Sequence, residues 1–360
     1  MTRRVAVVMS GFPRVSETFA LPELDALDRC GALGPVFSTK EGDGNPAQPE
    51  ARALLGRVER IPEGDLRARS RWLASRLADG GIAALHGYFA HEPTALAEAT
   101  ADLLGLPFGF SSHAKDVRKL HPGELARRAQ RARCVVACND DVAATLERAG
   151  ASVELIPHGV ALERFQPGPT PPAGALRILA VGRCVEKKGF RVLLEACARL
   201  AVPYEVRVVG DGPERRSLES LACRLGIRPG VTFAGIVTHE TLPSEYRWSD
   251  VVVVPSVVDR SGDRDGLPNV VLEALASGRA VVGTRVGAIA SVLVDRVNGL
   301  LVEPGDPVGL ARALASVADP DVRRALGQAG RQTVRAAYDA GARSRMFADT
   351  LGKRYEIDAG

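Results

Sequence analysis

The feature that most constrains this chain is a repeated alternation of short, β-branched apolar runs with amphipathic helical patterns. The first half contains such runs at 5–10, 82–89, 107–113, 134–139 and 153–159. The second half contains them at 176–182, 204–210, 231–235, 250–256, 280–284 and 299–305. Near-continuous apolar strands that alternate with helices are typical of parallel sheets covered on both faces. The sequence therefore predicts an α/β fold.

The two series are separated by the proline-rich stretch "RFQPGPTPPAGALR" (164–177), which has no apolar periodicity and is typical of an interdomain linker. A chain of 360 residues is long enough for two domains. We therefore expect two Rossmann-like, doubly wound domains, at 1–165 and 177–340, with a linker at 166–176. Residues 341–360 are expected to form a terminal helix that packs back towards the first domain. Ligands of such sheets bind beyond the carboxyl ends of the strands, so both sets of strand ends are expected to face a cleft.

The composition limits the class of protein. A hydrophobic fraction of 46% and a charged fraction of 25% are those of a soluble globular protein. The net charge of +4 is small and the basic residues are spread along the chain, so no nucleic-acid partner is expected. No apolar run reaches the roughly 20 residues of a membrane span. The N-terminal "RRVAVVMS" is interpreted as a first strand of a cytoplasmic protein rather than as a signal peptide.

The stretch "DVVVVPSVVDRSGDRDGLPNVVLEALASG" (250–278) predicts a buried strand, a polar loop and a helix that starts near Pro268. Proline is favourable at the first helical position because it has no N–H to leave without a partner there. The N–H groups of Asn269, Val270 and Val271 would then point out of the helix end, where they favour an anion. Gly266 allows a ligand to approach the backbone closely.

Two carboxylates flank this anion site. Glu273 lies slightly more than one turn into the helix and can accept hydrogen bonds from vicinal hydroxyls such as those of a ribose. Asp265, on the loop, can accept from hydroxyls on the other side of the anion. Hydroxyls, anion and hydroxyls in a row describe a nucleoside diphosphate sugar. The alternative is a helix start with a loop aspartate and a solvated glutamate.

Two cations follow an earlier strand in "ILAVGRCVEKKGF" (178–190). Arg183 and Lys188 suit a diphosphate, because arginine binds phosphate oxygens in a planar fork and lysine acts as a point charge. Basic surface residues near a turn are the alternative. The turn in "VVGDGPERRSL" (208–218) has glycines but no complete dinucleotide fingerprint.

Together the motifs "VGRCVEKKGF", "VVGDGPER", "VTFAG", "DVVVVPS", "DGLPNVVLEALASGRAVVGT" and "NGLLVEPGD" resemble the retaining glycosyltransferases of family 4, which have the GT-B fold. They match in order and spacing. The first half matches less tightly, through "SGFPRVSETF", "FSSHAKDV" and "IPHGVALERF", and resembles the branch found in exopolysaccharide and secondary-metabolite assembly.

The resemblance implies that Arg183 and Lys188 neutralise the diphosphate of the donor and that Glu273 holds its ribose hydroxyls. It also implies that the phosphates and sugar lie against the residues after Asp265, namely Gly266, Leu267, Pro268 and Asn269. The family usually has glutamate at the position of Asp265, which puts the identity or pose of the transferred sugar in question. Catalysis would come from stabilising the departing diphosphate, with Arg183, Lys188, Asp265 and His113 at the reaction centre.

In the first half, the resemblance places Gly11, at the bend of a strand-to-helix turn, against the donor phosphate. Glu17 is interpreted as a first-turn acid of the following helix, with an acceptor contact as the alternative. His113 follows a strand, and the resemblance implies that it meets the donor sugar, with Asp116 orienting it or binding the acceptor.

Three further histidines lie near predicted strand ends in the first half. His158 ends the last strand of that half. His86 and His91 are weaker candidates for acceptor contacts.

No metal and no cofactor are expected. Asp263-Arg264-Asp265 is formally a DxD pattern, which holds a divalent metal in the other large glycosyltransferase fold. Here Arg183 and Lys188 would neutralise the diphosphate instead, so the match is interpreted as coincidence.

One concentrated basic stretch, "RKLHPGELARRAQRAR" (118–133), is interpreted as a solvated helix face. The alternative is peripheral contact with anionic lipid or a phosphorylated carrier at the inner face of the membrane.

The expected function is therefore transfer of a hexosyl unit from a nucleoside diphosphate sugar to a hydroxyl acceptor, which is a glycan, a lipid-linked sugar or a small molecule. Three alternatives stay open: a GT-B sugar-nucleotide epimerase, a pyridoxal-phosphate phosphorylase and a non-catalytic protein that binds nucleotide sugars. An epimerase would convert the donor without any acceptor, and a phosphorylase would show the visible absorption band of its cofactor.

Overall fold

The computed structural model describes the chain at residues 3–12, 20–42, 53–78, 80–113, 116–117, 120–169 and 174–357. It divides the chain into two units, which are described separately. Unit 1 comprises residues 1–159 and 340–360, and unit 2 comprises residues 160–339.

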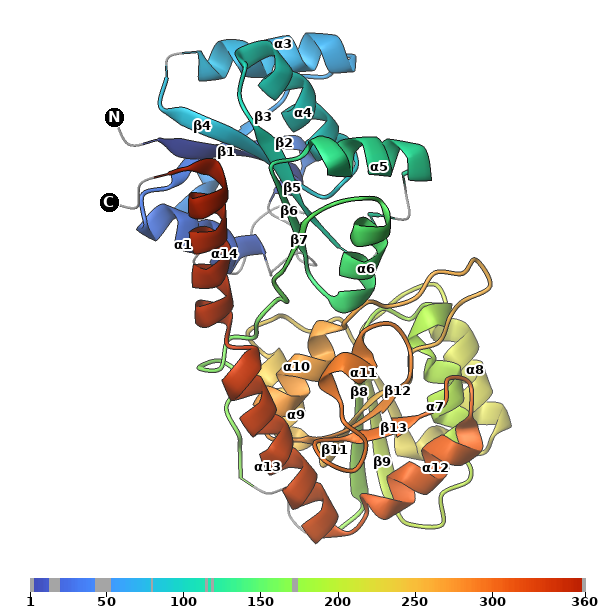
Figure 1. Ribbon diagram of the computed structural model, residues 1–360. Coiled ribbons are helices and arrows are strands. Elements are labelled where there is room, and N and C mark those ends of the chain that lie inside the picture. Colours follow the sequence, from blue (N-terminus) through green and yellow to red (C-terminus); the bar gives the residue numbers. More distant parts are fainter. Residues whose placement is uncertain are drawn as a thin grey trace. The chain divides into compact units, whose positions relative to one another are not determined.

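Unit 1 is built on a parallel sheet with the strand order β3-β2-β1-β4-β5-β6-β7 (Figure 1). Its strands are β1 (Arg4–Phe12), β2 (Leu33–Glu41), β3 (Val58–Arg60), β4 (Ile82–Tyr88), β5 (Phe108–Ser112), β6 (Cys134–Ala137) and β7 (Val153–Leu155). The strand order turns back between β1 and β4, which is the arrangement of a doubly wound sheet.

The sequence analysis missed two of these strands. Strand β2 was not predicted because Gly34 and Pro35 interrupt its start and its second half, Ser38–Glu41, is polar. Strand β3 is a three-residue edge strand with only one apolar residue, Val58. Neither segment has the continuous apolar run that marks a buried parallel strand.

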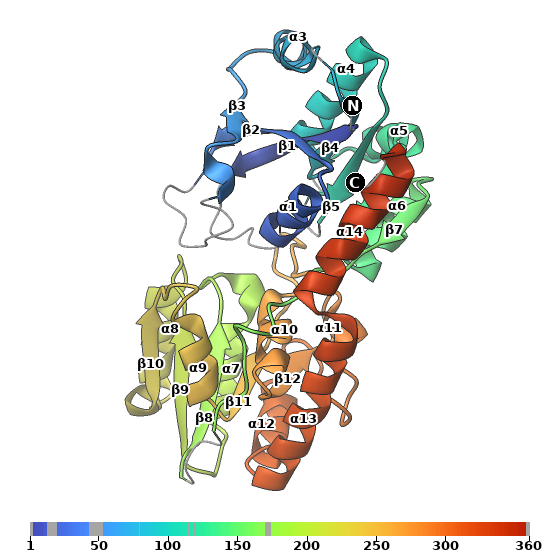
Figure 2. The ribbon, with the colours of Figure 1, turned by 90° about the vertical axis from the view of Figure 1, so that its left-hand side faces the viewer.

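Helices cover both faces of the sheet in unit 1. They are α1 (Ala20–Arg29), α3 (Leu66–Leu77), α4 (Glu92–Leu104), α5 (Pro122–Arg131), α6 (Asp140–Arg148) and α14 (Ala340–Tyr355). The last helix, α14, packs beside α1, from the opposite end of the sequence (Figure 2).

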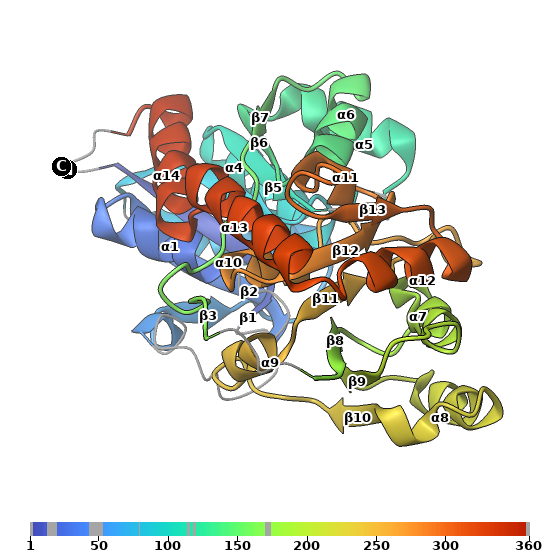
Figure 3. The same cartoon turned by 90° about the horizontal axis from the view of Figure 1, so that it is seen from below.

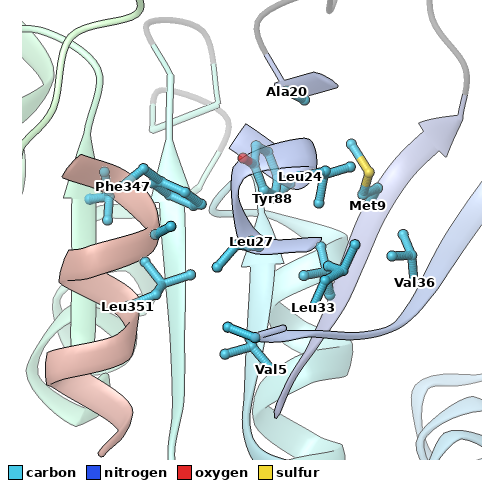
Figure 4. Close-up of a cluster of buried hydrophobic side chains, with 14 of the residues drawn as sticks. Val5, Met9, Ala20, Leu24, Leu27, Leu33, Val36, Tyr88, Phe347 and Leu351 are labelled. Atoms are coloured by element: carbon cyan, nitrogen blue, oxygen red, sulfur yellow. The ribbon is translucent and has the colours of Figure 1, made fainter. Parts of the chain in front are cut away.

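A buried cluster joins these two helices to one face of the sheet. Leu24 and Leu27 of α1 and Phe347 and Leu351 of α14 are fully buried against β1 and β4, together with Tyr88 (Figure 4). Full burial of one leucine or phenylalanine side chain contributes about 1.5–3 kcal/mol. This packing explains why the C-terminal helix belongs to unit 1.

Unit 2 has a second parallel sheet, with the order β10-β9-β8-β11-β12-β13 (Figure 3). Its strands are β8 (Leu176–Val181), β9 (Tyr204–Val209), β10 (Val231–Gly235), β11 (Val251–Val254), β12 (Ala280–Thr284) and β13 (Leu300–Val302). Its helices are α7 (Phe190–Cys197), α8 (Arg215–Arg224), α9 (Leu242–Trp248), α10 (Asn269–Ala276), α11 (Ile289–Val292), α12 (Pro307–Ser316) and α13 (Pro320–Ala337).

Alternate residues of these strands face opposite layers of helices. Val251 and Val253 of β11 pack with α7, α8 and α12, whereas Val252 and Val254 pack with α9, α10, α11 and α13. Burial on both faces explains the unbroken run of valine in β11. The sequence predicts all six strands of unit 2 from their apolar runs.

The boundary between the units lies a few residues earlier than the predicted end of the first domain at residue 165. Val160 pairs with Asp339 in an isolated bridge, and the ring of Phe165 lies 5.7 Å from that of Tyr246 in the core of unit 2. Residues 160–165 therefore belong to unit 2, because they bury their apolar side chains there.

Within unit 2 the strand order turns back between β8 and β11, so the loops after these two strands leave the same edge of the sheet side by side. In sheets of this kind, ligands bind outside the carboxyl ends of the strands at this point. The predicted motifs 183–190 and 255–269 are these two loops.

Candidate functional site

The first pair at this edge of the sheet is Lys188 with Asp265. Lys188 ends a short 3-10 turn after β8, and its Nζ lies 2.9 Å from Oδ2 of Asp265. The hydroxyl of Ser256, directly after β11, donates to the same oxygen at 2.7 Å. Asp265 is buried, so its charge depends on these two donors. The structure thus brings together two of the predicted site residues, through an ion pair that the sequence analysis did not foresee.

The other aspartate of the DxD pattern, Asp263, also meets a lysine. Lys187 Nζ lies 3.1 Å from Oδ2 of Asp263 and 3.8 Å from Oδ1 of Asp265. Sequence reasoning passed over Lys187 because only its neighbour Lys188 matched the motif. The two lysines give both carboxylates of the pattern a cationic partner from within the chain.

Arg183 differs from these lysines. It follows Gly182 just beyond β8 and its side chain is exposed. In the described part of the chain, its guanidinium makes no hydrogen bond or ion pair. Arg183 is therefore an accessible cation at the point where the strand order turns back, and its planar fork can bind phosphate oxygens.

The start of α10 differs by one residue from the prediction. Pro268 is the N-cap, with φ −67° and ψ 130°, and the first helical residue is Asn269. The N–H of Val271 donates to the carbonyl of Pro268 at 3.0 Å and is therefore occupied. Helix geometry leaves the N–H groups of Asn269 and Val270 for a ligand, rather than the three that the sequence analysis expected.

Two glycines let backbone segments approach each other beneath the site. Gly189 has φ +65°, and a Cβ on it would lie 1.8 Å from the carbonyl oxygen of Pro255. Gly287 has φ +55°, and a Cβ on it would lie 2.1 Å from the carbonyl oxygen of Asp265. A side chain at either position would displace the loop that carries Asp265. Gly287 was missed by the sequence analysis, since nothing local distinguishes it from an ordinary turn glycine.

Glu273 is buried within α10 rather than solvated. Its Oε2 accepts a hydrogen bond of 2.6 Å from the hydroxyl of Tyr246 on α9, a partner that the sequence analysis missed. Burial raises the pKa of Glu273 to about 7, while the Tyr246 hydroxyl and the charge of Arg164 act in the opposite direction. The free protein therefore holds Glu273 near its titration midpoint at neutral pH.

This raised pKa gives a testable prediction for binding of a nucleoside diphosphate sugar. Below about pH 7 Glu273 is protonated in the free protein, whereas two ribose hydroxyls favour the ionised carboxylate. Binding should therefore release a proton at about pH 6, and affinity should rise with pH through about 7 and then level. Both phosphates of such a donor are diesters and have no proton to release in this range.

Calorimetric titrations in two buffers of different ionisation enthalpy measure the released proton. Glu273→Gln should abolish the release. An equal release in this variant would show that another group titrates on binding.

In unit 1, His113 follows β5 and is partly exposed. Burial of its ring and the neighbouring His158 hold the pKa of His113 well below its ordinary value, so it is a neutral imidazole at pH 7. The ring of His158, just after β7, stacks on it with 5.0 Å between centroids.

Asp116 is buried behind this histidine. Its Oδ1 accepts from the backbone N–H of His113 at 2.6 Å, and its Oδ2 accepts from that of Ala90, also at 2.6 Å. Burial raises the pKa of Asp116 to about 6, against these hydrogen bonds. Of the two roles predicted from the sequence, this geometry suits orienting the segment that carries His113, because the carboxylate is directed at backbone amides.

Other predicted residues of unit 1 are placed differently. His86 is fully buried between the Tyr355 hydroxyl and Ser111, so the prediction that it contacts an acceptor is wrong. His91 caps α4 by accepting from the Glu92 N–H. Gly11 lies within β1, opposite Lys40 of β2, and not at the bend of a turn. Glu17 lies outside the described residues.

The described arginines of the basic stretch at 118–133 pair with carboxylates of unit 1, whereas Arg118 and Lys119 lie outside the described residues. The buried carboxylate of Glu98 on α4 forms ion pairs with Arg127, Arg128 and Arg131 of α5, and Arg133 pairs with Glu356. These pairs favour the interpretation as an ordinary helix face. Among the described residues, no helix combines the length and apolar character of a membrane span.

Comparison with known proteins relates part of the chain to a known family. Residues 175–319 match the family model described as glycosyl transferases group 1. The chain is 38% identical over 168 residues to the lipopolysaccharide core biosynthesis glycosyltransferase LpsE of Rhizobium meliloti, which covers 45% of this chain and 46% of that protein. It is 30% identical over 220 residues to the putative colanic acid biosynthesis glycosyltransferase WcaL of Escherichia coli, covering 59% and 54%. The chain thus spans about half the length of these curated relatives.

Solved structures extend the likeness of the fold to the whole chain. The HepE protein of Anabaena in complex with UDP aligns with a TM-score of 0.83 over 97% of this chain and 100% of that chain, at 16% identity. Sucrose-phosphate synthase of Thermosynechococcus elongatus aligns with a TM-score of 0.77 over 98% of both chains, at 23% identity. At these identities the likeness concerns the fold. Residues 175–319 thus match the glycosyl transferases group 1 family, and the chain has the two-domain GT-B fold.

Proposed function

We propose that this protein is a glycosyltransferase of family 4 that transfers a hexosyl unit from a nucleoside diphosphate sugar to a hydroxyl acceptor, with retention of configuration and without a metal ion. Unit 2 binds the donor. The observation that carries the proposal is the combination of accessible Arg183, paired Lys188 and two N–H groups at the start of α10, all where the strand order of unit 2 turns back.

These groups stabilise the negative charge that develops on the departing diphosphate. Arg183 binds phosphate oxygens through its fork, and the amides of Asn269 and Val270 donate from the helix end. Such preorganised donors act where charge develops in the transition state, which is the main requirement when the leaving group is a diphosphate. The lysines that pair with Asp263 and Asp265 support metal independence, because they already supply positive charge beside the two carboxylates.

The two acids hold the two ends of the donor. Glu273 accepts from the ribose hydroxyls, since its Oε1 makes no hydrogen bond within the described chain. Asp265 accepts from a hydroxyl of the transferred sugar and keeps Lys188 in place. The anomeric carbon remains exposed for attack by the acceptor hydroxyl on the face from which the diphosphate departs.

The acceptor belongs to unit 1 in this proposal. His113 offers a neutral imidazole that can accept a hydrogen bond from a hydroxyl at pH 7. The names of LpsE and WcaL, which refer to lipopolysaccharide core and colanic acid, support a glycan or lipid-linked sugar as the acceptor in polysaccharide biosynthesis.

A calorimetric donor screen tests the proposal. We expect one uridine, guanosine or deoxythymidine diphosphate sugar to bind in the presence of EDTA, and the matching nucleoside diphosphate to compete with it. If no donor in the screen binds, the proposal that unit 2 binds a nucleoside diphosphate sugar is wrong.

A further inference from the structure

Unit 1 contains a buried carboxylate, Glu23, to which the proposed reaction assigns no role. Glu23 lies in the first turn of α1 and is buried, with its Oε2 accepting a hydrogen bond from the hydroxyl of Tyr88 on β4. Its Oε1 lies 3.4 Å from Nδ1 of His158. Figure 4 shows the ring of Tyr88 beside α1, near Leu24. Glu23 therefore meets residues from two other elements at the carboxyl edge of the sheet.

His158, the histidine beside Glu23, is in ring contact with His113. The rings of His158 and His113 are nearly parallel, with an angle of 11° between them and centroids 5.0 Å apart. The ring of His113 also lies 4.9 Å from the ring of Phe89. Phe89 has φ +79°, a conformation that costs energy for a residue with a side chain.

The turn at Phe89 is held in this conformation from several sides. The Phe89 N–H donates to the carbonyl of Ser111 at 2.9 Å, and the hydroxyl of Thr94 donates to the carbonyl of Phe89 at 2.8 Å. Strained backbone that the surroundings hold in place is typical of functional sites. The walls around His113 are therefore rigid, and Glu23 supports one of them through His158.

The charge of Glu23 constrains the ring nitrogen that faces it. A buried carboxylate needs donors, and a neutral imidazole has one N–H, on either Nδ1 or Nε2. An acceptor at Nδ1 favours the tautomer with its proton on Nδ1. Free histidine in water prefers the opposite tautomer, so the Nδ1 tautomer requires an acceptor such as this carboxylate.

We propose that Glu23 is a positioning residue on the acceptor side of the reaction: it keeps the proton of His158 on Nδ1 and thereby fixes the ring against which His113 stacks. The inference rests on the proposed function, because it assigns the acceptor hydroxyl to this imidazole pair. Its structural part, the tautomer of His158, can be measured without any substrate.

The test is a ¹⁵N NMR spectrum of the histidine side chains in the full chain, recorded at about pH 8.5, where an ordinary histidine is neutral. In the wild type, His158 should carry its proton on Nδ1. In Glu23→Gln the carboxamide oxygen keeps the Tyr88 hydroxyl and the NH₂ group faces His158, so the proton should move to Nε2.

The same spectrum contains a matched reference. His91 accepts the Glu92 N–H on Nδ1, so its proton is on Nε2 in both proteins. Unchanged His91 signals show that the fold of unit 1 is retained. Tyr88→Phe is a second control, because it removes the other partner of Glu23 and should leave the His158 tautomer as in the wild type.

A wild-type His158 with its proton on Nε2 would overturn the proposal without any variant. An unchanged tautomer in Glu23→Gln would overturn it as well.

The kinetic consequence is separate. Glu23→Gln should lower kcat for transfer about 10-fold, as for loss of one oriented hydrogen bond, and should leave the donor KM unchanged. Unchanged kcat with the altered tautomer would remove Glu23 from the reaction. If the wild type transfers no sugar at all, the proposed function has failed, whereas the tautomer measurement still decides whether Glu23 controls His158.

Discussion

Arg183→Ala is expected to lower kcat/KM for the donor by about 10²-fold or more, as for loss of a group that stabilises leaving-group charge. The side chain is exposed and makes no hydrogen bond or ion pair with the residues that the structure describes, so the variant should fold normally. Initial rates and a thermal unfolding curve of the same preparation measure both effects.

Arg224→Ala is the matched control. Arg224 is also an exposed arginine of unit 2, but it lies in the last turn of α8. Its removal changes the net charge equally and should leave kcat/KM near the wild-type value. Near-normal turnover in Arg183→Ala would exclude this residue from the mechanism. Lys188→Ala is expected to reduce kcat/KM similarly but is less clean, because it leaves buried Asp265 without its nearest cation.

Substitutions of the two acids of unit 2, Glu273 and Asp265, are expected to impair different steps. Glu273→Gln should weaken binding of free nucleoside diphosphate and of the intact donor, because both contain the ribose. Asp265→Asn should lower kcat/KM for the donor while leaving the affinity for free nucleoside diphosphate unchanged. One charged hydrogen bond contributes roughly 1.5–3 kcal/mol, which corresponds to about tenfold or more. Calorimetric titration of each ligand resolves such differences.

The structure provides a control for each acid. Tyr246→Phe removes the hydroxyl that donates a hydrogen bond to Glu273 but keeps the Glu273 carboxylate, so nucleoside diphosphate binding should persist. Asp265→Glu restores the residue usual in the family and lengthens its reach by one methylene, so it should change donor preference rather than abolish activity. An equal loss of affinity for nucleoside diphosphate in Asp265→Asn and Glu273→Gln would show that the two acids do not bind different parts of the donor.

Local sequence patterns were sufficient for the strands of unit 2 but not for all of unit 1. Segments such as Val251–Val254 predict a strand that is buried on both faces, because every residue is apolar and β-branched. Strand β2 depends on its neighbours instead. Its polar residues Ser38 and Thr39 are buried, and the Thr39 hydroxyl donates to the carbonyl of Ser10 on β1 at 2.9 Å. Such a strand is stabilised by contacts that no local pattern contains.

The same distinction holds for the candidate site. Motifs with fixed spacing led to Arg183, Lys188, Asp265 and Glu273, and the structure brings Lys188 and Asp265 into contact. The partners that set their chemistry lie on other elements. Tyr246 comes from α9, and nothing in the sequence around it indicates that its hydroxyl meets Glu273.

In unit 1 the sequence pattern was misleading where burial decides. His86 lies within β4, where burial lowers its pKa to about 3 and its two ring nitrogens contact Tyr355 and Ser111. Tyr355 comes from the C-terminal helix. The packing of α14 onto this sheet helps to bury His86, whereas His113 is partly exposed.

The proposed reaction is metal-independent transfer of a sugar from a nucleoside diphosphate to an acceptor hydroxyl. The most direct measurement is a proton NMR time course with the donor found in the screen, a glycan acceptor and excess EDTA. We expect that the donor is consumed only when the acceptor is present and that the new glycosidic bond keeps the anomeric configuration of the donor. EDTA should have no effect. Conversion of the donor to another sugar nucleotide without acceptor, or activity that requires added magnesium or manganese, would contradict it.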